Sequence, residues 1–243
     1  MIPDIYINDI SMSRMGWIRE NIDFPVPKSQ TETVVVPGRN SPIRFTEALG
    51  SISFEPRAFT VNLSMLGTRK KFNELVKTVG NQFSGRLAKV ICSEEPGLYS
   101  IGTLQLTPSY DPLEGRGELV IECSDADSYR YHTDVTEVIV SGNAAVSLQN
   151  DYMPVIPVVT TTAETKLTWK IGTDTFNKTV SAGTWEFPEL QLSHGTNSVN
   201  VTGSGTTTFR YREGCLWVFS EFMLMVLCFI IPTFQSLQLR RHG

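Results

Sequence analysis

The stretch AFTVNLSM, residues 58–65, alternates between apolar and polar side chains. A period of two places successive side chains on opposite faces of a sheet, so such a run is typical of a strand with one buried face. The apolar face consists of Phe59, Val61, Leu63 and Met65. We therefore expect a strand over Ala58–Met65 that packs one side against a core.

The residues directly after this strand change to a helical period. The sequence LGTRKKFNELVKTVG, residues 66–80, has the i, i+3, i+4, i+7 spacing of one helix face at Phe72, Leu75, Val76 and Val79. Thr68 is the expected N-cap, and Gly80 is the expected C-terminal stop. The pattern predicts one amphipathic helix over about 68–80.

Shorter β-type runs surround this strand and helix. The predicted strands are Thr33–Val36, Leu87–Ile91, Tyr99–Leu106 and Gly117–Cys123, and a turn-rich loop is predicted over Pro108–Gly117. The unit is expected to close near Tyr129–Tyr131. Residues 1–131 are therefore predicted to form a β-rich domain with one helix.

Residues 132–214 have a different composition, because charge falls and Thr, Ser, Val and Asn dominate. They show no helical period of useful length. Their short alternating runs recur at a spacing typical of sandwiches, over Lys166–Ile171, Thr175–Val180, Trp185–Leu192, Ser198–Val201 and Thr206–Arg212. The expected fold class is mainly β, with a small antiparallel β-sandwich as the second domain.

The overall composition is that of a globular protein. The 243 residues are 41% hydrophobic and 19% charged, which excludes disordered and collagen-like classes. Lys and Arg number 21 against 25 Asp and Glu, for a net charge of −4. Affinity for phosphate backbones comes largely from clustered cations, so this balance argues against a nucleic-acid module.

The four cysteines, Cys92, Cys123, Cys215 and Cys228, have neither CxxC pairing nor zinc-finger spacing. Buried, reduced thiols are the expected state for Cys92 and Cys123, which lie in apolar alternating stretches. The first ten residues contain Asp4 and Asp9, and they lack the apolar segment of a signal peptide. The chain is therefore expected to be made in a reducing cytoplasm.

No motif for catalysis stands out. The three histidines, at 132, 194 and 242, lack metal-site spacing, and the nucleophile elbow, P-loop and dinucleotide-binding motifs are missing from the sequence. Asp111 and Glu114 are interpreted as loop carboxylates, and Asp125 and Asp127 as an acidic turn without the rest of a calcium loop. We expect no enzymatic activity, no cofactor and no metal site.

The order of features resembles the distal tail proteins of long-tailed, non-contractile phages and their prophages. The resemblance extends over about residues 1–214. The segments that carry it are Val34–Asn40, Phe45–Gly50, Phe54–Arg57, the strand and helix of Phe59–Gly80, Gly117–Cys123 with Asp127–Tyr131, Asn150–Pro157, Gly195–Val199 and Phe209–Gly214.

The resemblance implies an N-terminal ring domain that assembles into a hexamer, and a galectin-like or carbohydrate-module-like sandwich that points outward. The ring would join the tail tube to the tip or baseplate at the virion tail tip. Its partners would be the major tail tube protein, a tail-associated fibre or lysin protein and, in some phages, a receptor-binding protein. DNA would only pass through the central channel, and no membrane contact is expected.

An alternative interpretation is a carbohydrate-binding module involved in adhesion to the host surface. The sandwich offers Trp169, Trp185 and Tyr211 as aromatic platforms against sugar faces. Each of these side chains has an alternative role in core packing, and Trp169 alternates in phase with Leu167 and Ile171.

The end of the chain, residues 215–243, departs from the family pattern because it is strongly apolar. Phe222–Ile231 is an unbroken apolar run before Pro232. Three interpretations of Leu216–Phe234 stay open: a membrane anchor, a packed helix or strand, or a non-native end produced by a broken reading frame. We expect this segment to pack poorly, and its removal to leave the sandwich folded.

Overall fold

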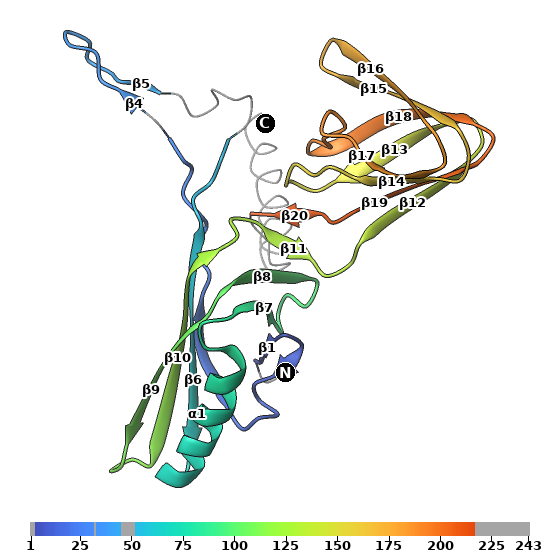
Figure 1. Cartoon of the computed structure of the whole chain (residues 1–243). Helices are drawn as coiled ribbons and strands as arrows, with labels where there is room; N and C mark the ends of the chain where they lie inside the picture. Colours follow the sequence, from blue (N-terminus) through green and yellow to red (C-terminus); the bar gives the residue numbers. More distant parts are fainter. Residues whose placement is uncertain (1–2, 32, 45–51, 217–243) are drawn as a thin grey trace, which may run out of the picture.

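A computed structural model describes residues 3–31, 33–44 and 52–216 of the chain. Within them the fold is mainly β with one helix, as predicted, and the paired strands are antiparallel. Figure 1 shows two groups of strands: one lies around the helix, and the other forms a separate pair of sheets. A small hairpin projects away from both groups.

The first group contains a four-stranded sheet in the order β3-β6-β10-β9. Its strands are β3 (Ile18–Asp23), β6 (Arg57–Leu66), β10 (Arg116–Ala126) and β9 (Gln105–Asp111). The alternation predicted for β6 is confirmed, since its apolar residues Phe59, Val61, Leu63 and Met65 are buried. They form one face of the core of this group.

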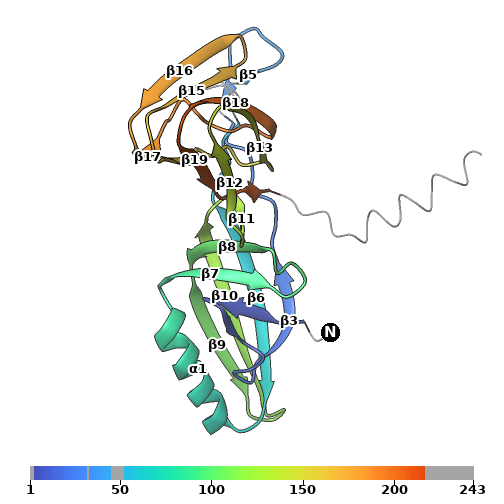
Figure 2. The same cartoon turned by 90° about the vertical axis from the view of Figure 1, so that its right-hand side faces the viewer.

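Helix α1 (Arg69–Phe83) covers that face, and Figure 2 shows it beside β9 and β10. Thr68 is the N-cap, as predicted, and its side-chain oxygen accepts a hydrogen bond from the Lys71 N–H. The predicted end at Gly80 is wrong, because the helix continues to Phe83. Phe83 lies four residues beyond Val79 on the same face and is buried, so packing extends the helix past the glycine.

A six-stranded sheet completes the first group in the order β2-β1-β7-β8-β11-β20. Its strands are β1 (Ile5–Ile7), β2 (Ile10–Ser11), β7 (Leu87–Cys92), β8 (Leu98–Thr103), β11 (Arg130–His132) and β20 (Gly214–Cys215). Ile5, Ile7, Ala88 and Val90 pack into the same core as β6 and α1.

Two predictions about the first group are wrong. The strand expected over Tyr99–Leu106 is two strands in different sheets, because the chain crosses from β8 to β9 at the fully buried Leu104. The loop expected over Pro108–Gly117 is shorter, since β9 runs to Asp111 and pairs with β10. A proline is tolerated there because β9 is an edge strand.

A projecting arm leaves the four-stranded sheet between β3 and β6. It carries the hairpin β4 (Thr33–Val34) and β5 (Ile43–Arg44), which Figure 1 shows at its far end. The two legs of the arm pair with each other near its base, where Ser29 and Phe54 form an isolated bridge. The strand predicted over Thr33–Val36 is therefore present but short.

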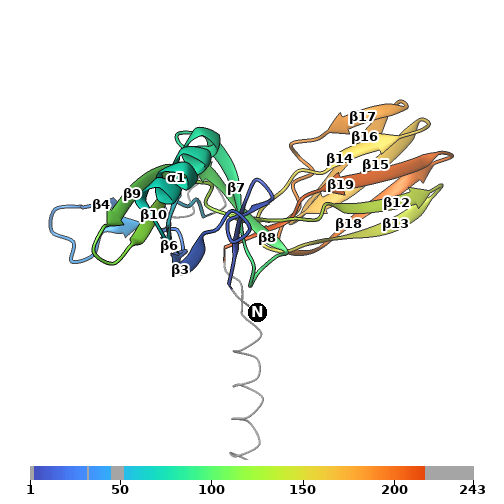
Figure 3. The ribbon, with the colours of Figure 1, turned by 90° about the horizontal axis from the view of Figure 1, so that it is seen from below.

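Two four-stranded sheets, ordered β12-β19-β14-β17 and β13-β18-β15-β16, make a sandwich around a second core. Figure 3 shows it beside the first group. Its strands are β12 (Thr136–Ser141), β13 (Ala144–Asn150), β14 (Val158–Thr161), β15 (Thr165–Ile171), β16 (Asp174–Val180), β17 (Gly183–Glu186), β18 (Gly195–Gly203) and β19 (Thr206–Tyr211).

The sandwich differs from the sequence prediction at its start and in one strand. Three strands before residue 165 were not predicted individually. The strand expected over Trp185–Leu192 ends at Glu186. Beyond it, Leu190 and Leu192 enter the core from irregular backbone, which explains their apolar character without a strand.

After the sandwich the chain returns to the first group. Gly214 and Cys215 form β20 and pair with Tyr131 and Arg130 of β11. Leu216, the first residue of the apolar C-terminal segment, is buried, whereas residues 217–243 lie outside the described residues. Across the described ranges, no helix is both long enough and apolar enough to span a membrane.

Candidate interaction surfaces

The four-stranded sheet has one face away from the core, and the charged residues on that face are mostly acidic. The register β6–β10–β9 places Glu118 and Glu122 on it, opposite the core residues Leu119 and Ile121. Asp23 lies in the row of Glu122, and Asp111 lies opposite Arg116, which pairs with Glu118. Carboxylates therefore outnumber cations on this face, which also exposes the apolar residues Ile18 and Leu66.

Both outer strands of this sheet have a free edge. Within the described part of the chain, β3 pairs only with β6, and β9 pairs only with β10. An unpaired edge presents backbone N–H and C=O groups that can accept a further strand. The sheet can therefore extend on both sides.

The projecting arm exposes consecutive valines. Val35 is 77% exposed, and its neighbours Val34 and Val36 are also exposed. β-Branched apolar side chains on an extended, isolated hairpin gain little from packing within one subunit. The arm is therefore a candidate contact for a second chain.

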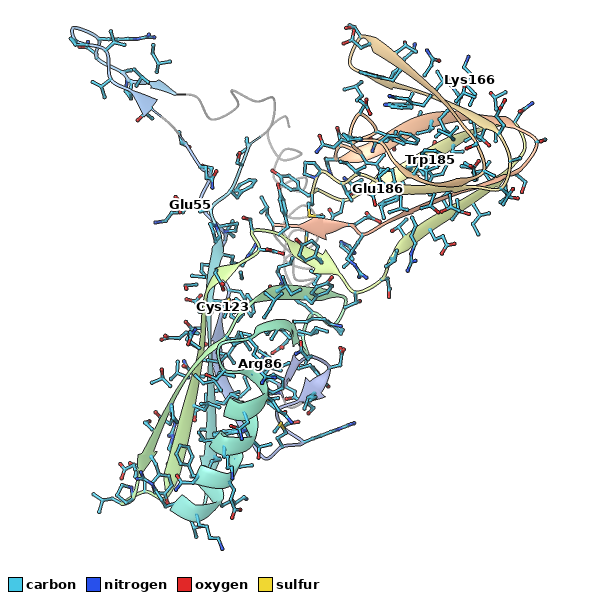
Figure 4. All side chains as sticks on the ribbon, viewed as in Figure 1. Glu55, Arg86, Cys123, Lys166, Trp185 and Glu186 are labelled. Carbon is cyan, nitrogen blue, oxygen red and sulfur yellow. The ribbon has the colours of Figure 1, made fainter. Side chains whose placement is uncertain are left out.

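The three aromatic residues singled out for sugar stacking lie in different surroundings. Trp169 is 3% exposed and Tyr211 is 4% exposed, and both belong to the sandwich core. The Trp169 Nε1–H donates to the Glu189 carbonyl at 2.9 Å, and the Tyr211 hydroxyl donates to the Gln149 carbonyl. Trp185 on β17 is 37% exposed and is labelled in Figure 4. Of these three aromatic residues, Trp185 is the one with an exposed ring.

A small hollow of about 130 Å³ lies at another place on the sandwich. It is lined by the end of β15, the start of β18 and the irregular segment between β17 and β18, including Lys170, Gln191 and Asn197. Trp185 does not line it. The hollow and the exposed tryptophan are thus separate features.

The loop carboxylates have structural partners. Asp111 Oδ1 accepts the N–H of Leu113 at 2.8 Å and that of Glu114 at 3.4 Å, so it caps the β9–β10 turn. Asp125 Oδ1 accepts the Thr103 N–H at 2.8 Å. Asp111 therefore acts in a turn, as interpreted. The acidic turn expected at Asp125 is wrong, because this residue lies within β10 at its β-bulge.

Polar and sulfur side chains meet where the sandwich joins the first group. His132 Nε2 lies 3.0 Å from Asp151 Oδ2, and one donor atom of each lies within 4.8 Å of the Cys215 sulfur. Burial raises the pKa of the Cys215 thiol to about 11. No motif in the sequence indicates this cluster, because its members come from three distant segments.

Arg57 lies close to the same junction and is 2% exposed. Its guanidinium donates to the carbonyls of Pro25 at 3.0 Å, Ser128 at 3.1 Å and Leu216 at 2.9 Å. Burial, together with the charge of Arg130, lowers the pKa of Arg57 to about 10. The group is still protonated at neutral pH and links the base of the arm to the end of the described chain.

The fold is similar to that of a solved phage protein. That structure is the SPP1 Dit protein, presented as a paradigm of the hub adsorption apparatus in phages that infect Gram-positive bacteria. The TM-score is 0.65 at 12% sequence identity, over 87% of this chain and 99% of the Dit chain. No family model and no curated protein matches the chain significantly. The resemblance found in the sequence is thus confirmed at the level of the fold.

Proposed function

We propose that the chain is a structural subunit of a phage tail. It forms a hexameric ring at the tail tip that joins the tail tube to the tip or baseplate, and it has no enzymatic activity. The observation that carries the proposal is the similarity of the fold to that of the SPP1 Dit protein. The similarity extends over 87% of this chain and 99% of the Dit chain. In this proposal the protein is made in the host cytoplasm and is located at the tail tip of the mature virion.

The free edges of the four-stranded sheet support ring formation. Six copies whose sheets lie side by side, β3 of one copy next to β9 of another, repeat one heterologous contact around a closed ring. Such pairing also satisfies the backbone groups of both edges, which are otherwise liable to aggregate.

The acidic face of the same sheet supports a channel for DNA. α1 covers one side of the sheet, so in the ring the uncovered face with Glu118 and Glu122 lines the central opening. Like charges repel phosphates, and a channel of this kind allows DNA to pass without binding it. The same channel would contain the tape-measure protein before the DNA passes through it.

The arm supplies a second contact between neighbouring subunits. Its exposed Val34 and Val35 become buried if the hairpin lies across an adjacent copy. The outer surfaces of the ring then remain for the major tail tube protein on one side, and for a tail-associated fibre or lysin protein and a receptor-binding protein on the other.

The test is the mass of the full chain by light scattering, alone and mixed with tail tube protein. A hexamer is expected in at least one of the two conditions, and Val35→Asp should prevent it because a carboxylate cannot be buried at the contact. Ile139→Asp is the matched control, since Ile139 is an exposed residue on the sandwich strand β12. A monomer in both conditions at every concentration overturns the ring.

The exposed ring of Trp185 favours carbohydrate binding as a second candidate function. A glycan array probed with the full chain tests it. Binding that is lost in Trp185→Ala and kept in Ile139→Ala supports the adhesion module. An array without any signal leaves the sandwich as a structural element of the ring, since a fold does not imply a function.

A further inference from the structure

The junction between the first strand group and the sandwich brings together three different metal-binding side chains. His132 ends β11, Asp151 follows β13, and Cys215 ends β20. One nitrogen, one carboxylate oxygen and the sulfur lie within 4.8 Å of one another, and the nitrogen and oxygen are 3.0 Å apart. Among the described residues, these three form the group of candidate metal ligands whose donor atoms lie this close together.

This donor set has the chemistry of a zinc site. Zn²⁺ takes imidazole nitrogen, carboxylate oxygen and thiolate sulfur at about 2.0–2.3 Å in tetrahedral geometry. Donors of such a site are roughly 3.3–3.8 Å apart, so these three need to move by less than about 1 Å. A water molecule would complete the tetrahedron.

Backbone hydrogen bonds hold the three segments together. The His132 N–H donates to the Glu213 carbonyl at 3.0 Å, and the Met153 N–H donates to the Gly214 carbonyl at 2.8 Å. β11 and β20 pair directly, with Arg130 opposite Cys215. The donors are therefore positioned before an ion arrives, which lowers the conformational cost of binding it.

Access and charge also fit a bound cation. The side chains of His132 and Asp151 are 38% and 39% exposed, whereas Cys215 is buried, so an ion enters from the solvent side and meets the sulfur last. A thiolate together with the Asp151 carboxylate balances the two charges of the ion. Arg130, which lies opposite Cys215 on β11, is paired with Glu95.

We propose that His132, Asp151 and Cys215 bind one divalent cation of the zinc type, which fastens the sandwich to the first strand group. Binding breaks the Cys215 S–H bond and forms a metal–sulfur bond, and the proton goes to solvent. The proposal does not depend on the ring, because the donors belong to a single chain.

Co²⁺ is the probe, because a cobalt–thiolate bond gives a charge-transfer absorption band and tetrahedral cobalt gives strong visible bands. Titration of the full, metal-free chain is expected to saturate at one equivalent, and Zn²⁺ should displace the cobalt. Cys215→Ser is expected to lose the charge-transfer band. His132→Gln and Asp151→Asn should each weaken Co²⁺ binding by about tenfold or more, since even outer-shell changes cost that much.

Two cysteine variants are the controls. Cys123→Ser removes another buried thiol, and Cys228→Ser removes the thiol of the C-terminal segment, and both should keep the band. Circular dichroism checks that each variant is folded. If Cys215→Ser does not fold, the half-exposed His132→Gln decides the question. The proposal is overturned by no band at one equivalent, by a band that survives Cys215→Ser, or by a band lost in Cys228→Ser.

Discussion

The ring of Phe72 on α1 lies directly over Gly117 on β10. A β-carbon at position 117 would stand 2.2 Å from Phe72 Cδ2 and 2.7 Å from Cε2. Gly117 has ordinary extended backbone, so the glycine is required by space and not by its conformation. This contact sets how closely the helix approaches the sheet that we place around the channel.

Gly117→Ala is therefore expected to destabilise the first strand group by about 1–3 kcal/mol, the usual cost of overpacking a core. The loss should be smaller in a Phe72→Leu background, where the methyl group finds room, and urea unfolding of the four proteins measures this coupling. Gly97→Ala is the control, since a β-carbon there meets nothing within 4 Å. Equal losses of stability in Gly117→Ala and Gly97→Ala would contradict the close contact between Phe72 and Gly117.

Arg57→Met should lower the free energy of unfolding by about 3 kcal/mol or more. The substitution fills the space but leaves the buried carbonyls of Pro25, Ser128 and Leu216 without their donor. Arg210→Met, on the exposed side of β19, should change stability by less than about 0.5 kcal/mol. Denaturant unfolding compares the two variants.

The same contact changes the expectation for removing the C-terminal segment. A truncation that starts at Leu216 deletes an acceptor of Arg57 and a buried side chain, so it should lower the thermal midpoint of the first strand group. A truncation after Leu216 keeps both. Scanning calorimetry of the two truncated proteins distinguishes them, and identical midpoints would show that the Arg57–Leu216 bond contributes nothing.

Asp4 is expected to make stability depend on pH in the acid range. Burial raises its pKa, but hydrogen bonds from Ser11, Ser13 and Ile5 outweigh this and hold the pKa below its usual value. A lowered pKa in the folded state gives stability that is present above the unfolded pKa of about 3.9 and is lost as pH falls through the folded value.

Asp4→Asn should therefore cost about 1–3 kcal/mol at neutral pH, where the native carboxylate is charged and fully bonded. The difference from the natural sequence should shrink as the pH falls below the unfolded pKa of aspartate. Urea titrations at neutral pH and at acid pH give the measurement. Asp134→Asn, at an exposed position, serves as the control and should show no such trend. If the loss of stability caused by Asp4→Asn grows in acid, the pKa of Asp4 is not lowered in the folded state.

Trp169→Ala and Trp185→Ala should differ strongly in stability. Trp169 is packed in the sandwich core beside Phe176 and Phe187, so its loss should cost about 3–5 kcal/mol. Trp185 is partly exposed and donates one hydrogen bond, to the Ser181 carbonyl, so its loss should cost about 1 kcal/mol. Thermal unfolding of the two variants checks the contrast, and similar losses would contradict the different burial.

Local sequence determined those features whose cause is local. The alternation over Ala58–Met65 predicts the buried face of β6, because one-sided burial on a pleated strand imposes a period of two. Thr68 could be predicted as the N-cap because its side chain satisfies an amide only three residues away. The mainly β class follows in the same way from turn spacing and alternation.

Tertiary structure alone decided the features that depend on distant partners. α1 passes Gly80 because Phe83 finds a place in the core, and the run Tyr99–Leu106 divides because its two halves pair in different sheets. The cluster at the junction forms because β20 returns to β11, which brings Cys215 to His132 and Asp151. Pairing between strands far apart in the chain leaves no periodic signal in either strand, so these contacts could not be predicted from the sequence.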